Sequence, residues 1–170
     1  MAVVIETARL RLRGHGLGDL DASAAMWGDE SVTRFIGGKP SSCEDSWRRM
    51  QTYVGHWAML GHGFWLIEDK ATGRFLGEGG FGNFKRDIDP PFDAPEQGWA
   101  FAPHAQGKGH AHEAMSAAIG WGEQHFGRSD FVCLIAPDNA PSLRLADKLG
   151  YREYGRSPYK GEPSVQLRRA

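Results

Sequence analysis

The first third of the chain combines a short alternating stretch with two stretches of helical periodicity. Residues 9–13 alternate arginine and leucine, which is typical of a half-buried strand with Leu10 and Leu12 toward the core. Residues 19–29 and 42–60 instead repeat apolar side chains every three or four positions, which predicts two amphipathic helices. Their predicted apolar faces comprise Leu20, Ala24 and Trp27 in the first, and Trp47, Met50, Val54 and Trp57 in the second, with Ser41 or Ser42 as N-cap.

Strand-like segments dominate the middle of the chain. Residues 64–69 and 74–84 are predicted strands joined through a hairpin-like turn at residues 71–73. Residues 85–95 contain three prolines and three aspartates, so they predict a loop. Residues 96–103 follow as a further strand.

The last third alternates helices and strands. A helix from Ala111 to about Phe126 carries its apolar side chains on one face, and residues 131–136 form a continuous apolar run typical of an interior strand. Residues 139–149 predict a shorter helix closed by Gly150, and residues 151–156 and 164–168 a final antiparallel pair. The predicted helical face from Ala111 comprises Ala114, Met115, Ala118, Ile119 and Gly122. The order predicts an α/β (α+β) fold in which helices flank a mixed sheet.

Composition narrows the class of protein. With 170 residues, 41% hydrophobic and 24% charged, the chain suits one compact domain over residues 1–170. A net charge of -1 gives no general attraction to nucleic acid or to an anionic membrane, so neither is expected as a partner. Two cysteines are too few for a disulfide scaffold, no apolar run reaches about 20 residues, and charges interrupt any leader near the N-terminus. A reducing cytoplasm is the expected compartment.

A glycine-rich junction connects the strand ending near Pro103 to the following helix. Glycines let successive backbone N–H groups turn toward one point, and the positive end of a helix favours an anion there. Lys108 adds a mobile charge. The junction is not a P-loop, because no glycine opens it and His110 replaces the hydroxyl residue. The predicted anion cradle comprises Gln106, Gly107, Lys108, Gly109, His110 and Ala111.

Three motifs together resemble one enzyme family. The Q-x-x-G-x-A pattern at residues 106–111 resembles the pyrophosphate loop of the GCN5-related N-acetyltransferases (GNAT), and N-x-x-S at residues 139–142 followed by K-x-G-aromatic at residues 148–151 resembles that family's second cofactor motif. Residues 6–13 and 32–37 are similar to the opening of the RimJ/RimL-type ribosomal-protein acetyltransferases. The likeness covers nearly the whole chain.

The resemblance implies a fold, a cosubstrate and a reaction. It implies the GNAT fold, a mostly antiparallel sheet of six or seven strands with about four helices. It implies acetyl-CoA as cosubstrate, no metal, and transfer of the acetyl group to a primary amine by direct attack in a ternary complex. The acceptor would be a protein N-terminus or a small molecule, and the protein a monomer or a homodimer. The cofactor-binding residues implied are Phe101, Ala102, Gln106, Gly107, Lys108, Gly109, His110, Ala111, Asn139 and Ser142.

Two catalytic residues follow from the same comparison. Glu96, in Glu96-Gln97-Gly98-Trp99, lies where this branch tends to carry a strand glutamate, and we expect it to act as base on the amine, directly or through water. An exposed glutamate at a strand start is the alternative. Many members have a tyrosine acid where this chain has Ala146, so Ser142 is the expected donor to the departing thiolate, unless it only caps its helix.

Other patterns favour structural interpretations. Residues 77–82 satisfy G-x-G-x-x-G, but no helix follows, so we expect glycines in a bulged or closely approached strand. His110 and His112 point about 200° apart on a helix and so cannot share a metal ion. Cys133 lies in an apolar run and is expected to be structural rather than an acyl carrier. Two rivals stay open: a degenerate acyl-CoA-binding sensor, and a nucleotide-binding enzyme.

Overall fold

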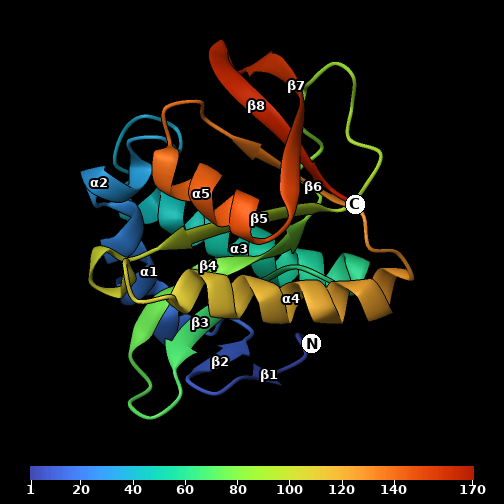
Figure 1. Ribbon diagram of the computed structural model, residues 1–170. Helices are drawn as coiled ribbons and strands as arrows, with labels where there is room; N and C mark the ends of the chain where they lie inside the picture. The colour runs from blue at the N-terminus through green and yellow to red at the C-terminus, as the bar shows by residue number, and fades with distance from the viewer.

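An eight-stranded sheet forms the centre of the computed structural model, which describes residues 1–170 (Figure 1). Its strand order is β1-β2-β3-β4-β5-β6-β8-β7. All neighbouring pairs are antiparallel except β5 and β6. The strands are β1 (Ile5–Glu6), β2 (Leu10–Arg13), β3 (Phe64–Asp69), β4 (Phe75–Gly82), β5 (Glu96–Phe101), β6 (Phe131–Ile135), β7 (Tyr151–Tyr159) and β8 (Glu162–Arg169).

Five α-helices cover the two faces of this sheet (Figure 1). One face carries α4, which packs on β2, β4 and β5, and α5, which packs on β7. The other carries α1, α2 and α3, with α1 on β4 and α3 on β3. The helices are α1 (Leu20–Trp27), α2 (Glu30–Thr33), α3 (Cys43–Leu60), α4 (His110–Phe126) and α5 (Ala140–Lys148). The mostly antiparallel mixed sheet is confirmed, with one strand and one helix more than expected.

The two additional elements are short. The strand β1 has two residues and the helix α2 has four, so each spans only about one period of side chains, too few for a repeating pattern to predict it. The N-cap of α2 is Asp29, whose carboxylate accepts a hydrogen bond from the backbone N–H of Ser31. That cap is visible in the sequence only once the helix is known.

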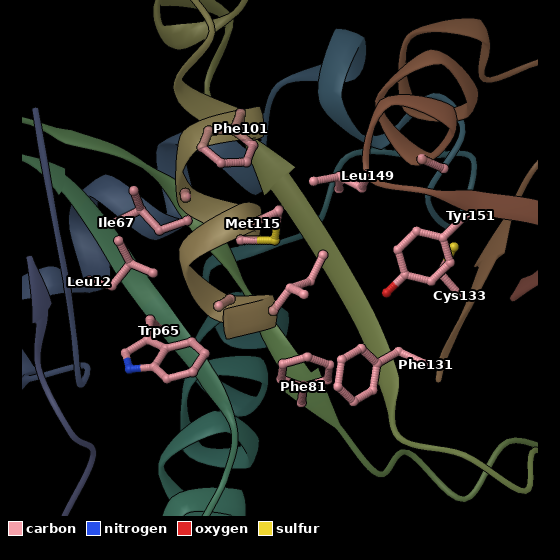
Figure 2. Close-up of a cluster of buried hydrophobic side chains, with 14 of the residues drawn as sticks. Leu12, Trp65, Ile67, Phe81, Phe101, Met115, Phe131, Cys133, Leu149 and Tyr151 are labelled. Carbon is pink, nitrogen blue, oxygen red and sulfur yellow. The ribbon is translucent and has the colours of Figure 1, made fainter. Parts of the chain in front are cut away.

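The main core lies between the sheet and α4. Figure 2 shows Leu12, Ile67 and Phe101 gathered around Met115 of α4, with Phe81 and Phe131 side by side. The expected α4 face is confirmed, because Ala114, Met115, Ala118, Ile119 and Gly122 are all buried.

Helix α3 buries a different face from the one predicted. Its buried residues are Ser46, Met50, Tyr53 and Trp57, whereas Val54 is exposed and Trp47 is only partly buried. Met50 and Trp57 were predicted correctly. The apolar pattern failed because a serine and a tyrosine occupy inward positions, where the tyrosine borders a cavity. The N-cap is Ser42, in a capping box with Asp45.

The glycines of β4 permit close packing. A Cβ on Gly77 would lie 2.4 Å from the carbonyl oxygen of Ala100, and one on Gly79 would lie 2.6 Å from Cε of Met115. With a larger residue at these positions, β5 could not lie so close to Gly77, and α4 could not lie so close to Gly79. The interpretation of residues 77–82 as a closely approached strand is therefore confirmed, and the fingerprint of a dinucleotide-binding fold is absent here.

Candidate active site

The parallel strands β5 and β6 separate after one register pair. Glu96 of β5 is opposite Val132 of β6, and no later pair joins the two strands. The backbone N–H of Ala102, a predicted cofactor-binding residue, donates to the carbonyl oxygen of Leu76, so that amide is already used. Successive N–H groups of a strand point to opposite edges, so those of Phe101 and Trp99 point to the separated side. The splay thus leaves an open strand edge inside the molecule.

Beside this edge, the glycine-rich junction presents unpaired amides. Gly107 and Gly109 have positive φ angles of 72° and 78°, which glycine adopts without the strain of a side chain. The backbone N–H groups of residues 107–112 donate to no protein acceptor. The helix α4 begins directly afterwards, so its positive dipole end faces the same point. This geometry fits a phosphate or diphosphate group.

Three contacts hold the junction in place. The side chain of Gln106 donates from Nε2 to the carbonyl of Phe101 at 3.0 Å. His110 Nδ1 is 3.2 Å from the carbonyl oxygen of Ala105. Arg9 donates from Nη1 to the carbonyl of Lys108 at 2.9 Å, and its Nε bonds Glu113 of α4 at 2.6 Å. Gln106 therefore supports the loop, and its own side chain is occupied.

A cavity of about 470 Å³ runs from these amides along the open edge of β5. We call it the phosphate-loop cavity. Of the predicted cofactor-binding residues, it is bordered by Phe101, Gln106, Gly107, Gly109, His110, Ala111, Asn139 and Ser142. Ala102 and Lys108 do not border it. Arg144 and Lys148 of α5 add two positive charges to its wall.

The start of α5 brings Ser142 to the open edge of β5. Asn139 is the N-cap, and its side-chain oxygen accepts from the backbone N–H of Ser142 at 3.3 Å. The hydroxyl oxygen of Ser142 accepts from the indole Nε1 of Trp99, also at 3.3 Å. Because that oxygen already accepts one hydrogen bond, the hydroxyl proton is free to point into the cavity.

A second cavity, of about 270 Å³, lies on the other face of β5, toward α1 and α3. We call it the aromatic cavity. It also contains Arg49, Arg86 and Glu96, and Gly98 leaves room within it, since a Cβ there would be 2.9 Å from the Phe64 ring. Its aromatic lining comprises Trp27, Phe35, Tyr53, Phe64, Phe84, Trp99 and Tyr159.

The two cavities share part of their walls. Trp99 and Ser142 border both, and so do Asn139, Phe35 and Ile36. A group held along the phosphate-loop cavity and a group in the aromatic cavity would therefore meet beside the Ser142 hydroxyl. This is the arrangement that a reaction between two substrates requires.

Glu96 is the one carboxylate that lines the aromatic cavity. Both of its oxygens accept from Nε of Arg86, at 2.7 and 2.9 Å, and the guanidinium stacks near Phe84 and Tyr159. Burial raises the pKa of Glu96 above its ordinary value, although the hydrogen bonds and charge of Arg86 act in the opposite direction. The alternative interpretation, an exposed glutamate at a strand start, is wrong, since the side chain of Glu96 is only 7% exposed.

Glu78 of β4 is a second buried carboxylate, behind the aromatic cavity. It accepts from Ser23 at 2.7 Å and from Trp27 Nε1 at 2.8 Å, and His15 Nε2 lies 3.1 Å away. Burial opposes its ionisation, but these hydrogen bonds outweigh burial and keep the pKa of Glu78 below the ordinary value. Glu78 does not border the cavity. Its contacts fix the indole of Trp27 in the cavity wall.

Several other groups are accounted for by packing. Burial and the charge of Glu96 raise the pKa of the Cys133 thiol well above its usual value, so it is protonated and unreactive at neutral pH. Ala146 is fully buried in the core and borders neither cavity.

No three His, Cys, Asp or Glu side chains gather as a metal site. None of the helices has the length and apolar character needed to cross a bilayer.

Comparison with known proteins identifies the family. Residues 9–152 match the family model described as an acetyltransferase (GNAT) domain. The chain belongs to the GNAT acetyltransferase family. A Bordetella pertussis protein assigned to that family has a solved structure with 36% identity, a TM-score of 0.85 and 99% of both chains covered. The N-acetyltransferase p20 of Bacillus licheniformis is 28% identical over 88% of this chain and 82% of its own. YkkB of Bacillus subtilis is 38% identical, over only 53% of this chain and 51% of its own.

More distant GNAT structures share the fold. A RimL ribosomal L7/L12 α-N-protein acetyltransferase in complex with CoA has a TM-score of 0.78 at 17% identity, covering 98% and 97% of the two chains. A Vibrio cholerae spermidine N-acetyltransferase in complex with CoA and spermine has a TM-score of 0.73 at 18% identity, covering 95% of each chain. This chain is thus an acyltransferase of a family that uses acetyl-CoA, and its resemblance to RimJ/RimL-type enzymes extends to the fold.

Sequence patterns missed the residues that complete the site. Trp99 had no assigned role, although its indole holds Ser142. Arg86 and Arg49 lie in a loop and on a helix, where arginine is common, so no local signal distinguishes them. Arg9 belongs to the motif that carried the family resemblance, but nothing in that motif shows its contact with the junction over 99 residues.

Proposed function

We propose that the whole chain, residues 1–170, is one acetyl-CoA-dependent N-acetyltransferase domain that acetylates a primary amine by direct attack in a ternary complex. The shared wall of the two cavities at Ser142 supports this proposal most. The acceptor amine enters from the aromatic cavity, and the cosubstrate lies along the phosphate-loop cavity. The acceptor is a protein N-terminus or a small amine, and the following inference narrows this choice.

The phosphate-loop cavity fits acetyl-CoA on two grounds. The unpaired amides of residues 107–112 suit the diphosphate, with Lys108 nearby, and the open edge of β5 suits the extended pantetheine arm through the backbone of Trp99 and Phe101. When bound, acetyl-CoA supplies an acetyl group on a good leaving thiolate. Arg144 and Lys148 offer charge to its remaining phosphate.

Two residues near the place where the cavities meet, Glu96 and Ser142, have complementary roles in proton transfer. As the amine nitrogen bonds to the carbonyl carbon and the carbon–sulfur bond breaks, Glu96 takes the proton that the nitrogen loses, directly or through water. Its oxygens keep free lone pairs beside Arg86. Ser142 gives its hydroxyl proton to the departing thiolate. Proton release from Glu96 and reprotonation of Ser142 restore the site and balance the reaction.

Acetyl-CoA binding and CoA release test this function separately. Calorimetry should detect acetyl-CoA binding, and a thiol reagent should detect CoA release that depends on an amine. Initial rates should give intersecting lines, and Cys133→Ala should retain turnover, because attack is direct. Binding without turnover on any amine would indicate the acyl-CoA sensor. Stabilisation by NAD or ATP but not by acetyl-CoA would indicate a nucleotide-binding enzyme.

A further inference from the structure

The charge of the aromatic cavity is unusual for a site that receives an amine. Its lining contains two arginines and one carboxylate. Glu96, the carboxylate, is paired on both oxygens with Arg86, so this pair is close to neutral toward a ligand. Arg49 has no carboxylate within ion-pair distance. The lining therefore has one positive charge, on Arg49, that no lining carboxylate pairs with.

Arg49 is held with its guanidinium available. Its guanidinium carbon lies 3.9 Å from the centroid of the Trp27 ring, and one nitrogen donates weakly to Ser41 Oγ at 3.4 Å. Glu78 fixes the indole of Trp27 by a hydrogen bond at 2.8 Å. A planar guanidinium stacked on an immobile ring keeps its in-plane N–H groups free, which suits bidentate binding of a carboxylate.

The remaining lining is apolar, and the space is small. Aromatic rings dominate the wall, and about 270 Å³ is just below the range of about 300–1,000 Å³ that is usual for small-molecule pockets. A polyamine needs carboxylates for its second and third ammonium groups, and this wall offers none that is unpaired. A compact molecule with one amine, one anionic group and an apolar body satisfies every group in the wall.

We infer that the acceptor is a small amino acid-like molecule whose carboxylate binds Arg49 while its amine reaches Glu96 and Ser142. This inference rests on the proposed function and narrows its substrate class. The aromatic rings contact the body of the acceptor between the two polar ends. Arg49 acts on binding and does not touch the reacting atoms.

Matched acceptors test the inference. L-phenylalanine is compared with L-phenylalaninamide, and 6-aminohexanoate with 1,6-diaminohexane, by CoA release at saturating acetyl-CoA. The carboxylate of at least one pair should have a kcat/KM about tenfold or more above its partner, the gain expected from a charge-assisted hydrogen bond. The amine of the amide is less basic, so a larger fraction of it is the neutral nucleophile at a given pH. This difference alone would favour the amide, so it cannot produce a preference for the carboxylate. If the amide and the diamine are both used as well as, or better than, their carboxylate partners, the inference is overturned.

Variants of Arg49 locate the effect. Arg49→Gln should raise KM for the carboxylate about tenfold or more with kcat little changed, and leave the amide unaffected, while Arg49→Lys should retain part of the preference. Arg48→Gln is the matched control, because Arg48 is the exposed neighbour paired with Glu44. An unchanged acid-to-amide ratio in Arg49→Gln, with a native thermal melt, would overturn the role of Arg49.

A binding measurement separates failure of the inference from failure of the function. Calorimetry of the CoA complex should show heat with L-phenylalanine or 6-aminohexanoate, and none with the amide or diamine. This result stands even if no amine is acetylated, in which case only the proposed function fails. Absence of binding by both acids in wild type, together with binding of either partner, would overturn the inference alone.

Discussion

The phosphate-loop cavity and the aromatic cavity meet at Ser142 but are built differently. The first presents backbone groups, namely the amides of residues 107–112 and the open edge of β5. The second presents side chains brought from α1, α3, β3, β5 and β7. The backbone groups of the first come from β5 and the junction directly after it, whereas the side chains of the second come from many distant segments. Under the proposed function, recognition of the constant cosubstrate depends on the main chain, while acceptor choice depends on side chains that can change singly.

The largest expected effect is at the point where the cavities meet. Ser142→Ala should lower kcat about 100-fold, because the departing thiolate loses its proton donor, while the Kd of acetyl-CoA stays within about threefold. Stopped-flow or steady-state CoA release gives kcat, and calorimetry gives Kd. Ser116→Ala, an exposed serine on α4, is the control. Unchanged turnover would remove Ser142 from the chemistry and leave it as a wall residue.

Glu96→Gln tests the aromatic cavity through pH. A base works ionised, so kcat/KM should fall as pH drops through the raised pKa of Glu96, and the variant should lose this acid limb and about tenfold in rate. In the variant, the pH dependence of kcat/KM should come only from deprotonation of the acceptor amine. Acceptors with amines of different pKa should shift that part of the profile and so identify it. A pH profile identical to wild type would mean that a water chain, or Glu78, takes the proton.

Folding stability should respond to Glu96 in the opposite direction. Because the pKa of Glu96 is raised, the folded protein keeps a proton that the unfolded chain releases near its ordinary value of 4.5. Its contribution to stability is therefore lost as pH rises from that value through the native pKa. Urea unfolding over this interval should show the slope in wild type and not in Glu96→Gln, because the neutral amide does not titrate.

Gly109→Ala tests the backbone-built cavity. A side chain at φ 78° costs about 1–2 kcal/mol, and a loop that relaxes moves its amides, so acetyl-CoA should bind about tenfold more weakly. Gly120→Ala is the matched control on α4, where a Cβ meets nothing within 4 Å, and it should stabilise the fold by up to about 1 kcal/mol. Equal CoA affinity in both variants would contradict a backbone-defined site.

The smallest effect is expected at the contact that holds this loop. Arg9→Gln should weaken acetyl-CoA binding about two- to fivefold without changing kcat, since the pair with Glu113 is half exposed. Arg11→Gln, two residues later in β2 and paired with Glu6, should have no effect on CoA affinity. Glu113→Gln should match Arg9→Gln, and the double variant should be no worse than either. Additive losses would mean that the two residues act independently of the loop.

Comparison of the predicted and observed elements shows where sequence patterns are informative. The α4 face was predicted fully because five small or apolar residues recur at helical spacing. The α3 face was predicted in part, because Tyr53 faces a cavity and Val54 faces outward. Phe101 and Ala102 were both predicted to bind the cofactor, but pairing with β4 uses the backbone amide of Ala102. Strand pairing decides which backbone amides stay free, and a local sequence pattern does not show which strands pair.

The sequence by itself determined the parts of this protein that depend on neighbours along the chain. Gly107 and Gly109 permit the positive φ angles of the junction before the Ala-rich helix, and Asn139 caps α5 over three residues. Only the tertiary structure decided that β5 and β6 separate, that Trp99 holds Ser142, and that Arg86 neutralises Glu96 while Arg49 stays unpaired. Charge balance and hydrogen-bond satisfaction in a cavity depend on which side chains from distant positions lie there. Packing of the whole chain determines that combination.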